Sequence, residues 1–203
     1  MAVDTNHGVY SSDYTQGGIA LYNASSIEQR LHMFIAMDPP KHDEQRKAVS
    51  PIVASQNLAS MEGTIRARTA KVLDELPRNE EFNWVQRVSI ELTTQMLATL
   101  FDFPFEDRKL LTWWSDVSTS VPEVDHIVES QEARLAELGK MFNYFTRLWN
   151  ERVNSAPKND LVSMLAHNPA TRHMPPLEYM GNLILLIVGG NDTTRNSMSG
   201  GVL

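Results

Sequence analysis

Residues 186–196 read LIVGGNDTTRN, and this stretch is the most informative part of the chain for its fold. It lies at the end of a continuous apolar run, Leu183 to Val188, and turns polar within a few residues. As part of a helix the stretch is unfavourable, because each interior glycine costs roughly 1 kcal/mol relative to alanine and Asn, Asp and Thr compete for backbone hydrogen bonds. A compensating contact or function is therefore expected at residues 189–194.

In the functional interpretation, the glycines and the polar residues of this stretch have separate roles. Gly189 and Gly190 leave room for a small ligand against the backbone, while Asp192 and Thr193 supply an acid and a hydroxyl for proton delivery. Two alternatives stay open. The glycines could end a helix, with Asp192 or Thr193 capping the next one. The apolar run could instead be a buried strand that enters a phosphate-binding turn, although the third glycine of GxGxxG and the lysine of a P-loop are missing.

A second polar stretch, residues 38–46, reads DPPKHDEQR. Two prolines start a helix here, and His42 and Arg46 follow four residues apart on one face, which apolar Val49 continues. A cationic pair at the head of an apolar face suits a buried anion, such as the carboxylates of a cofactor, which Arg46 can contact in a forked geometry. The alternative is that Arg46 pairs with Asp43 on a solvated helix face.

The composition excludes several classes of protein. Of the 203 residues, 42% are hydrophobic, which is enough for a core. The chain carries 18 Lys and Arg against 25 Asp and Glu, a net charge of −7 that argues against binding to nucleic acid or to an anionic membrane surface. Because cysteine is absent, these residues contain no disulfide, thiolate metal site or cysteine nucleophile. Neither a membrane span nor a signal peptide is predicted, so a cytoplasmic location is expected.

Apolar residues recur at helical spacing along most of the chain beyond residue 40, whereas residues 1–40 read as loop with short helical pieces. The expected helices, several of them bounded by prolines, cover about residues 41–54 with an interruption at Pro51, 58–75, 85–100, 105–121, 125–154, 160–167 and 176 onward. Their expected apolar faces include Leu58, Ile65 and Leu73 in the second helix and Leu135, Leu138 and Phe145 in the fifth, which is the longest expected. No strand pattern or internal repeat is present, so the predicted class is mainly α.

The remaining candidate metal ligands do not form a recognisable site. Glu123 and His126 match one Glu-x-x-His half of a carboxylate-bridged di-iron site, but such a site needs a second pair and two further glutamates. We therefore predict no metal site from protein ligands within these residues.

Together, the two polar stretches resemble those of a bacterial cytochrome P450. Residues 38–46 resemble the P450 helix whose His and Arg bind the haem propionates. Residues 189–193, GGNDT, are similar to the oxygen-binding segment of that family's long central helix, usually written Ala/Gly-Gly-x-Asp/Glu-Thr. The sequences of residues 37–43, 49–54 and 188–198 are similar to characteristic stretches of one bacterial subfamily, the soluble alkane hydroxylases. The order of the two stretches, the number of residues between them and the helices predicted in that interval all agree with this family.

This resemblance implies a partial cytochrome P450 fold, roughly helices B to I, with residues 1–203 as a fragment of a single domain. The cofactor would be haem b (iron protoporphyrin IX), bound by His42 and Arg46. Gly189 and Gly190 would let the central helix bulge over bound oxygen, where Asp192 would relay protons and Thr193 would hydrogen-bond the oxygen. Residues 17–37 and 105–117 would frame the substrate channel.

The implied reaction is monooxygenation of medium-chain alkanes or fatty acids at the terminal carbon, using molecular oxygen and electrons from a ferredoxin and its NAD(P)H-dependent reductase. The early sheet strands and the haem-thiolate half, with the axial cysteine, are expected to lie outside this chain, so the fragment alone should be inactive. The competing class is a non-catalytic helical interaction domain in which both stretches are ordinary caps.

Overall fold

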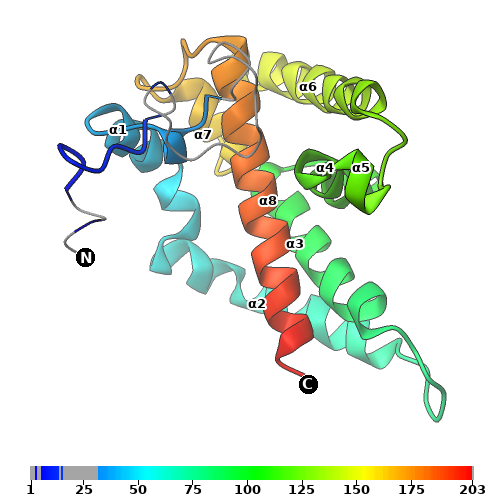
Figure 1. The fold of residues 1–203 in the computed structure, drawn as a ribbon. Coiled ribbons are helices and arrows are strands. Elements are labelled where there is room, and N and C mark those ends of the chain that lie inside the picture. Colours follow the sequence, from blue (N-terminus) through cyan, green and yellow to red (C-terminus); the bar gives the residue numbers. More distant parts are fainter. Residues whose placement is uncertain (1–2, 4–5, 14, 16–31, 203) are drawn as a thin grey trace.

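The longest helix of the described residues, α8 (Pro176–Gly200), passes through the middle of the molecule, with α1 (Lys41–Val49) on one side and α4 (Lys109–Thr119) on the other (Figure 1). The computed structural model describes residues 3, 6–13, 15 and 32–202, and within them all regular secondary structure is helical. The mainly α prediction is therefore confirmed.

Proline positions explain several helix boundaries. Pro51 lies in the first turn of a short 3₁₀ helix, η4 (Ser50–Val53), which follows α1 as the sequence predicted. The other α-helices are α2 (Ser55–Asp74), α3 (Glu91–Phe101), α5 (Pro122–Asp125), α6 (Gln131–Val153) and α7 (Leu161–His167). The other short elements are the 3₁₀ helices η3 (Phe34–Ala36) and η6 (Phe105–Asp107) and a π-helical turn, η5 (Val85–Ile90).

The helix predicted over residues 125–154 begins later than expected and is not the longest. Pro122 starts the separate turn α5, which ends where His126 adopts a left-handed conformation with φ 56°. The chain then extends to Ser130, whose side chain accepts a hydrogen bond from the Ala133 N–H and caps α6. The apolar spacing could not locate this break, because a left-handed residue and an N-cap leave the periodicity intact.

The core is formed where α3, α4 and α6 pack around α8. Its fully buried side chains come from all four helices and include Phe101, Leu111, Phe145, Leu183, Ile184 and Ile187. The apolar run of α8 is thus explained by neighbours on several sides, which removes most of its circumference from water. Leu138 and Phe145 of α6 are buried as predicted, whereas Leu135 is 58% exposed.

α2 forms at the predicted place but leaves its apolar face uncovered. Leu58, Ile65 and Leu73 are 44%, 37% and 44% exposed, and Val72 alone among the residues of α2 is buried. The spacing therefore predicted the helix correctly but not the burial of its face. In the part of the chain that the structure describes, no helix has the length and apolarity to cross a membrane.

Candidate functional site

His42 and Arg46, the cationic pair of the sequence analysis, lie one turn apart on α1. The Nδ1 atom of His42 lies 2.8 Å from the carbonyl oxygen of Phe34, and the Phe34 ring packs edge-on against the imidazole at 6.2 Å between centroids. Because a carbonyl only accepts, Nδ1 must carry the hydrogen. The other nitrogen, Nε2, can then donate to an anion only when the ring is an imidazolium.

Arg46 is exposed and has no acidic partner among the described residues. The alternative in which Arg46 pairs with Asp43 is therefore not what the structure contains. The guanidinium keeps its donors available for a group outside this part of the chain. An exposed arginine beside a histidine with a fixed tautomer is an arrangement that can accept a carboxylate through charge-assisted hydrogen bonds.

The glycine-containing stretch lies within α8, which continues unbroken from Pro176 to Gly200. Both structural alternatives, a helix end at the glycines and a buried strand, are therefore wrong. The hydroxyl of Thr193 donates to the carbonyl of Gly189 one turn earlier, at 2.7 Å. This bond uses the hydroxyl hydrogen and leaves the oxygen lone pairs of Thr193 available to a neighbour.

The two glycines have different surroundings. A Cβ built on Gly189 would meet nothing within 4 Å, whereas one built on Gly190 would lie 2.7 Å from Cδ1 of Leu97 on α3. The open space expected at both glycines is therefore absent at Gly190, which instead permits close packing of α8 against α3. Gly189 and Thr193, four residues apart and both exposed, form what we call the open face of α8.

Asp192 lies beside the open face and is held by an arginine network. Its carboxylate accepts a hydrogen bond from Arg195, and Arg195 also donates to Asp116 on α4 at 3.0 Å. Burial lowers the pKa of Arg195, but its bonds to Asp116 and Asp192 outweigh that effect and raise it, so the guanidinium stays charged. The network fixes the orientation of the Asp192 carboxylate relative to α4.

Asn191 points in the other direction, into the protein. It is fully buried, and its Oδ1 accepts a hydrogen bond from the Thr93 hydroxyl on α3 at 3.1 Å, while its Nδ2 has no partner in the described structure. Together with Gly190, Ile184 and Ile187 it belongs to what we call the closed face of α8.

The two motifs are connected by a buried polar network that sequence reasoning missed. Glu178, in the first turn of α8, accepts hydrogen bonds from Lys41 at 2.6 Å and from Gln45, both on α1. Asn182 donates to Gln45 at 2.9 Å and accepts from the Phe34 N–H at 2.8 Å. No local spacing could have revealed these pairs, because the partners on α1 and α8 are 133 or 137 residues apart.

Gly181 supports the same junction by letting the backbone of His32 cross α8. A Cβ at this position would overlap the His32 carbonyl group, so a side chain there is sterically excluded. This glycine had no visible signal in the sequence, because a helix-interior glycine alone does not indicate what approaches it.

The structure also bears on two other predictions, the incomplete Glu-x-x-His pair and the two segments of the substrate channel. Glu123 and His126 are exposed, and the described residues contain no cluster of three metal-ligating side chains. Residues 105–117 form η6 and most of α4, which packs directly against α8. Of the other proposed channel segment, residues 17–31 lie outside the described residues.

Comparison with known proteins places this geometry in context. No family model matches the chain. Over 98% of its length it is similar to cytochrome P450-153 from Novosphingobium aromaticivorans (TM-score 0.81, 44% identity) and to CYP153D17 from Sphingomonas sp. PAMC 26605 (TM-score 0.82, 45% identity), covering 50% of each. Linalool 8-monooxygenase from Pseudomonas putida is 30% identical over 201 residues, which are 94% of this chain and 48% of that protein. The chain thus spans about half the length of the relatives it matches.

Proposed function

Because the chain belongs to the bacterial cytochrome P450 family, we propose that the full-length protein is a cytoplasmic haem-dependent monooxygenase that hydroxylates medium-chain alkanes or fatty acids at the terminal carbon. The observation that carries the proposal is the open face of α8, at Gly189 and Thr193, in a chain that also presents an uncompensated cation, Arg46. The resemblance of residues 37–43, 49–54 and 188–198 to soluble bacterial alkane hydroxylases supports the alkane class of substrate.

The described residues fit haem on two separate grounds. A flat cofactor requires a helix face without side chains at the point of closest approach, and nothing within 4 Å occupies the Cβ position of Gly189. Its propionates require cationic donors, and Arg46 together with the imidazolium form of His42 supplies them. Haem would supply the activation of molecular oxygen, and because these residues contain no cysteine, a thiolate ligand would have to come from outside them.

Asp192 and Thr193 are proposed to move protons on the open face. Asp192 is oriented by Arg195, so its carboxylate can exchange protons with solvent without losing its position. The Thr193 oxygen accepts a hydrogen bond from a water on the open face while its own hydrogen is held by Gly189. Rotation of the hydroxyl away from the Gly189 carbonyl would let Thr193 donate in turn.

Electrons are proposed to come from a ferredoxin and its NAD(P)H-dependent reductase, as the resemblance to soluble bacterial alkane hydroxylases implies. Residues 105–117, which form η6 and most of α4, are proposed to border the substrate channel, since α4 packs directly on α8. The contact between α4 and α8 would then hold the substrate close to Asp192 and Thr193, the groups proposed to move protons.

The decisive experiment replaces Arg46 in the full-length protein. Arg46 is exposed in this structure and would be desolvated only by the bound cofactor. Breaking a buried charge pair costs on the order of 3 to 5 kcal/mol, so Arg46→Ala should transfer haem to apomyoglobin at least about tenfold faster than the parent. Lys47→Ala, which removes the adjacent exposed cation, is the matched control and should retain haem normally. Equal haem retention by Arg46→Ala and the parent would remove Arg46 from the cofactor site.

A second measurement tests whether the 203 residues are active alone. Because they contain no cysteine, haem added to this chain should give a reduced carbon monoxide spectrum without the band typical of thiolate ligation. Detection of that band would contradict the proposal that the axial ligand lies elsewhere in the protein.

A further inference from the structure

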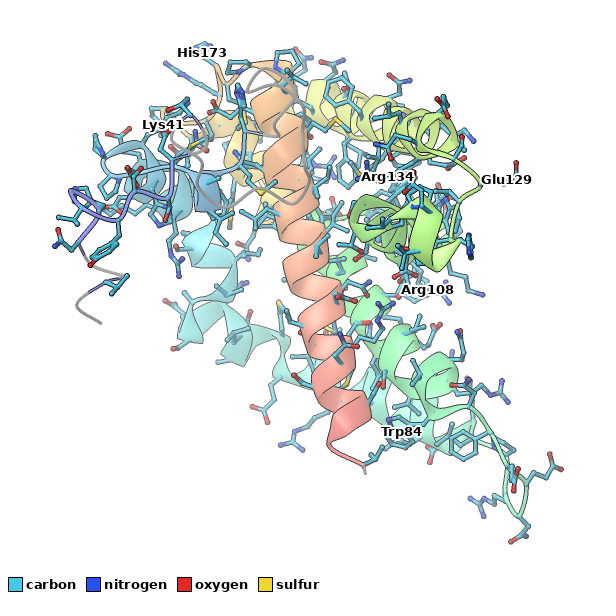
Figure 2. The ribbon with its side chains drawn as sticks, in the orientation of Figure 1. Lys41, Trp84, Arg108, Glu129, Arg134 and His173 are labelled. Atoms are coloured by element: carbon cyan, nitrogen blue, oxygen red, sulfur yellow. The ribbon has the colours of Figure 1, made fainter. Side chains whose placement is uncertain are left out.

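A groove of about 550 Å³ lies between α2, η5, α3 and the start of α4, and no residue of α1 or α8 lines it. Its charged lining consists of five basic side chains, Arg68, Lys71, Arg87, Arg108 and Lys109, and two acidic ones, Glu75 and Glu91. The whole chain has a net charge of −7, so the groove is a local reversal of charge. Figure 2 shows Arg108 between α4 and α3, at one wall of this groove.

Two of the basic side chains already have acidic partners. Arg108 donates to Glu91 at 2.9 Å and to the Phe105 carbonyl at 2.9 Å, and Lys71 lies 3.9 Å from Glu75. Burial raises the pKa of Glu91, but hydrogen bonds from Gln95 and Arg108 outweigh that effect and lower it, so this carboxylate stays ionised. Both acids of the groove are therefore already paired.

Arg68 is the basic residue whose position is fixed without charge compensation. Its Nη1 donates to the Gln95 carbonyl at 2.7 Å and to the Thr99 hydroxyl at 2.5 Å, which are both neutral acceptors. No acidic side chain pairs with it among the described residues, and burial lowers its pKa. A partly buried guanidinium held by neutral groups keeps an unneutralised charge that favours an anion.

The exposed side of the groove adds further unpaired cations. Arg87 and Lys109 are exposed, and neither forms an ion pair within 4.0 Å in the part of the chain that the structure covers, although the charge of Lys109 helps to lower the pKa of Glu91. Arg87 is carried by η5, a π-helical turn, which is a rare geometry that is frequently found at functional sites. The Phe105 ring lies under the guanidiniums of Arg68, at 5.6 Å, and Arg108, at 4.3 Å, and so holds both planes in place.

We propose that this groove binds a small molecule that carries a phosphate or pyrophosphate group, with Arg68 as its fixed contact and Arg87 and Lys109 closing the anion from the solvent side. The three cations Arg68, Arg87 and Lys109, which form no ion pair among the described residues, match a polyanion better than a single carboxylate. A volume of about 550 Å³ is within the usual range for small-molecule sites, which favours such a ligand over the surface of an acidic protein. The site is separate from α8 and does not depend on haem.

Isothermal titration calorimetry of the full-length holoprotein with sodium pyrophosphate tests the proposal, at about 0.1 M ionic strength so that distant charges are screened. The parent should bind one pyrophosphate. Arg87→Gln combined with Lys109→Gln, which removes exposed and unpaired side chains, should weaken binding at least about tenfold without affecting folding. Arg68→Gln should weaken it further, with circular dichroism melting as the check on its fold.

The matched control is Arg66→Gln, which makes the same charge change on α2 but replaces a side chain paired with Glu62 and lining a different surface. It should leave pyrophosphate binding unchanged. Equal weakening by Arg66→Gln would show nonspecific attraction and overturn the proposal, as would the absence of any binding at millimolar pyrophosphate. Tighter binding of polyglutamate than of pyrophosphate, lost in the Arg87 and Lys109 variant, would replace the small-molecule ligand by an acidic peptide.

Discussion

The open and closed faces of α8 are built from neighbouring residues of one sequence stretch, yet their surroundings are opposite. Gly189 and Thr193 face open space, whereas Gly190 meets Leu97 and Asn191 hydrogen-bonds Thr93. Adjacent residues in a helix point about 100° apart, so one residue step is enough to exchange one face for the other. The two adjacent glycines therefore serve different purposes: Gly189 leaves an open surface, and Gly190 allows close packing against Leu97.

The contrast also separates two kinds of polar residue. Asn191 is a buried amide that ties α8 to α3, and its contribution is to packing and register. Asp192 and Thr193 keep part of their polar surface available and are the groups suited to chemistry. Substitutions in α8 test this division.

Asp192→Asn should have the largest effect, on turnover of the full-length holoprotein. Loss of a positioned acid–base group typically costs about a hundredfold or more, so formation of hydroxylated product should slow by about that factor. The control is Asp116→Asn, which removes the other carboxylate bound to Arg195 and should slow product formation much less. If both variants were equally slow, the ion-pair network as a whole would be responsible.

Gly190→Val should destabilise the protein while Gly189→Val does not. At Gly190 the new side chain must enter the space of Leu97, and overpacking of this kind costs about 1 to 3 kcal/mol. At Gly189 nothing within 4 Å opposes it in the cofactor-free protein. Guanidinium unfolding of the cofactor-free full-length protein measures both free energies, and equal losses would show that the two faces are not distinct.

Thr193→Ala should affect the efficiency of oxygen use more than binding. The hydroxyl on the open face is proposed to hold a water for proton delivery, so its loss should lower the alcohol formed per NADH a few-fold and raise the release of peroxide. Substrate affinity should be unchanged, and Thr193→Ser should restore the parental ratio. Parental coupling in Thr193→Ala would remove this hydroxyl from proton delivery.

Asn191→Leu should have the smallest effect, a change of less than about 1 kcal/mol in the free energy of unfolding. The substitution removes one hydrogen bond to Thr93 but also removes a buried Nδ2 that has no partner in the described structure, and these contributions offset each other. The Thr93 hydroxyl retains the Ser89 carbonyl at 2.9 Å as an acceptor. A loss well above that value would indicate that Nδ2 has a partner such as a bound water.

Several features of the fold could be predicted because they depend on local chemistry. Pro51 divides the helix after residue 41 since proline has no N–H to donate, and the side chain of Asp160 caps α7 as an N-cap should. The break before α6 and the exposure of Leu135 could not be predicted. Apolar periodicity reports which face of a helix is hydrophobic and carries no information about what covers it.

The candidate site shows the same limit. The spacing of His42 and Arg46 placed them on one helix face, but the contact that fixes the histidine tautomer joins Nδ1 to the carbonyl of Phe34, which belongs to the separate 3₁₀ helix η3. The network of Glu178, Gln45 and Asn182 that joins the two motifs involves residues that have no shared sequence signal. Long-range polar pairs of this kind depend on the packing of α1 against the start of α8.

Composition and residue spacing were enough to establish that the chain is helical and where most of its helices lie, and they singled out two polar stretches as candidates for chemistry. These inferences follow from side-chain volume, hydrogen-bonding capacity and spacing along one chain. The packing of the helices was needed to show that Gly189 opens α8 while Gly190 packs it, and that Arg68 lies in a basic groove. It also showed that neither Arg46 nor Arg68 has an acidic partner among the described residues. The physical reason is that a side chain's environment is set by atoms from distant segments, and their positions depend on how the helices pack.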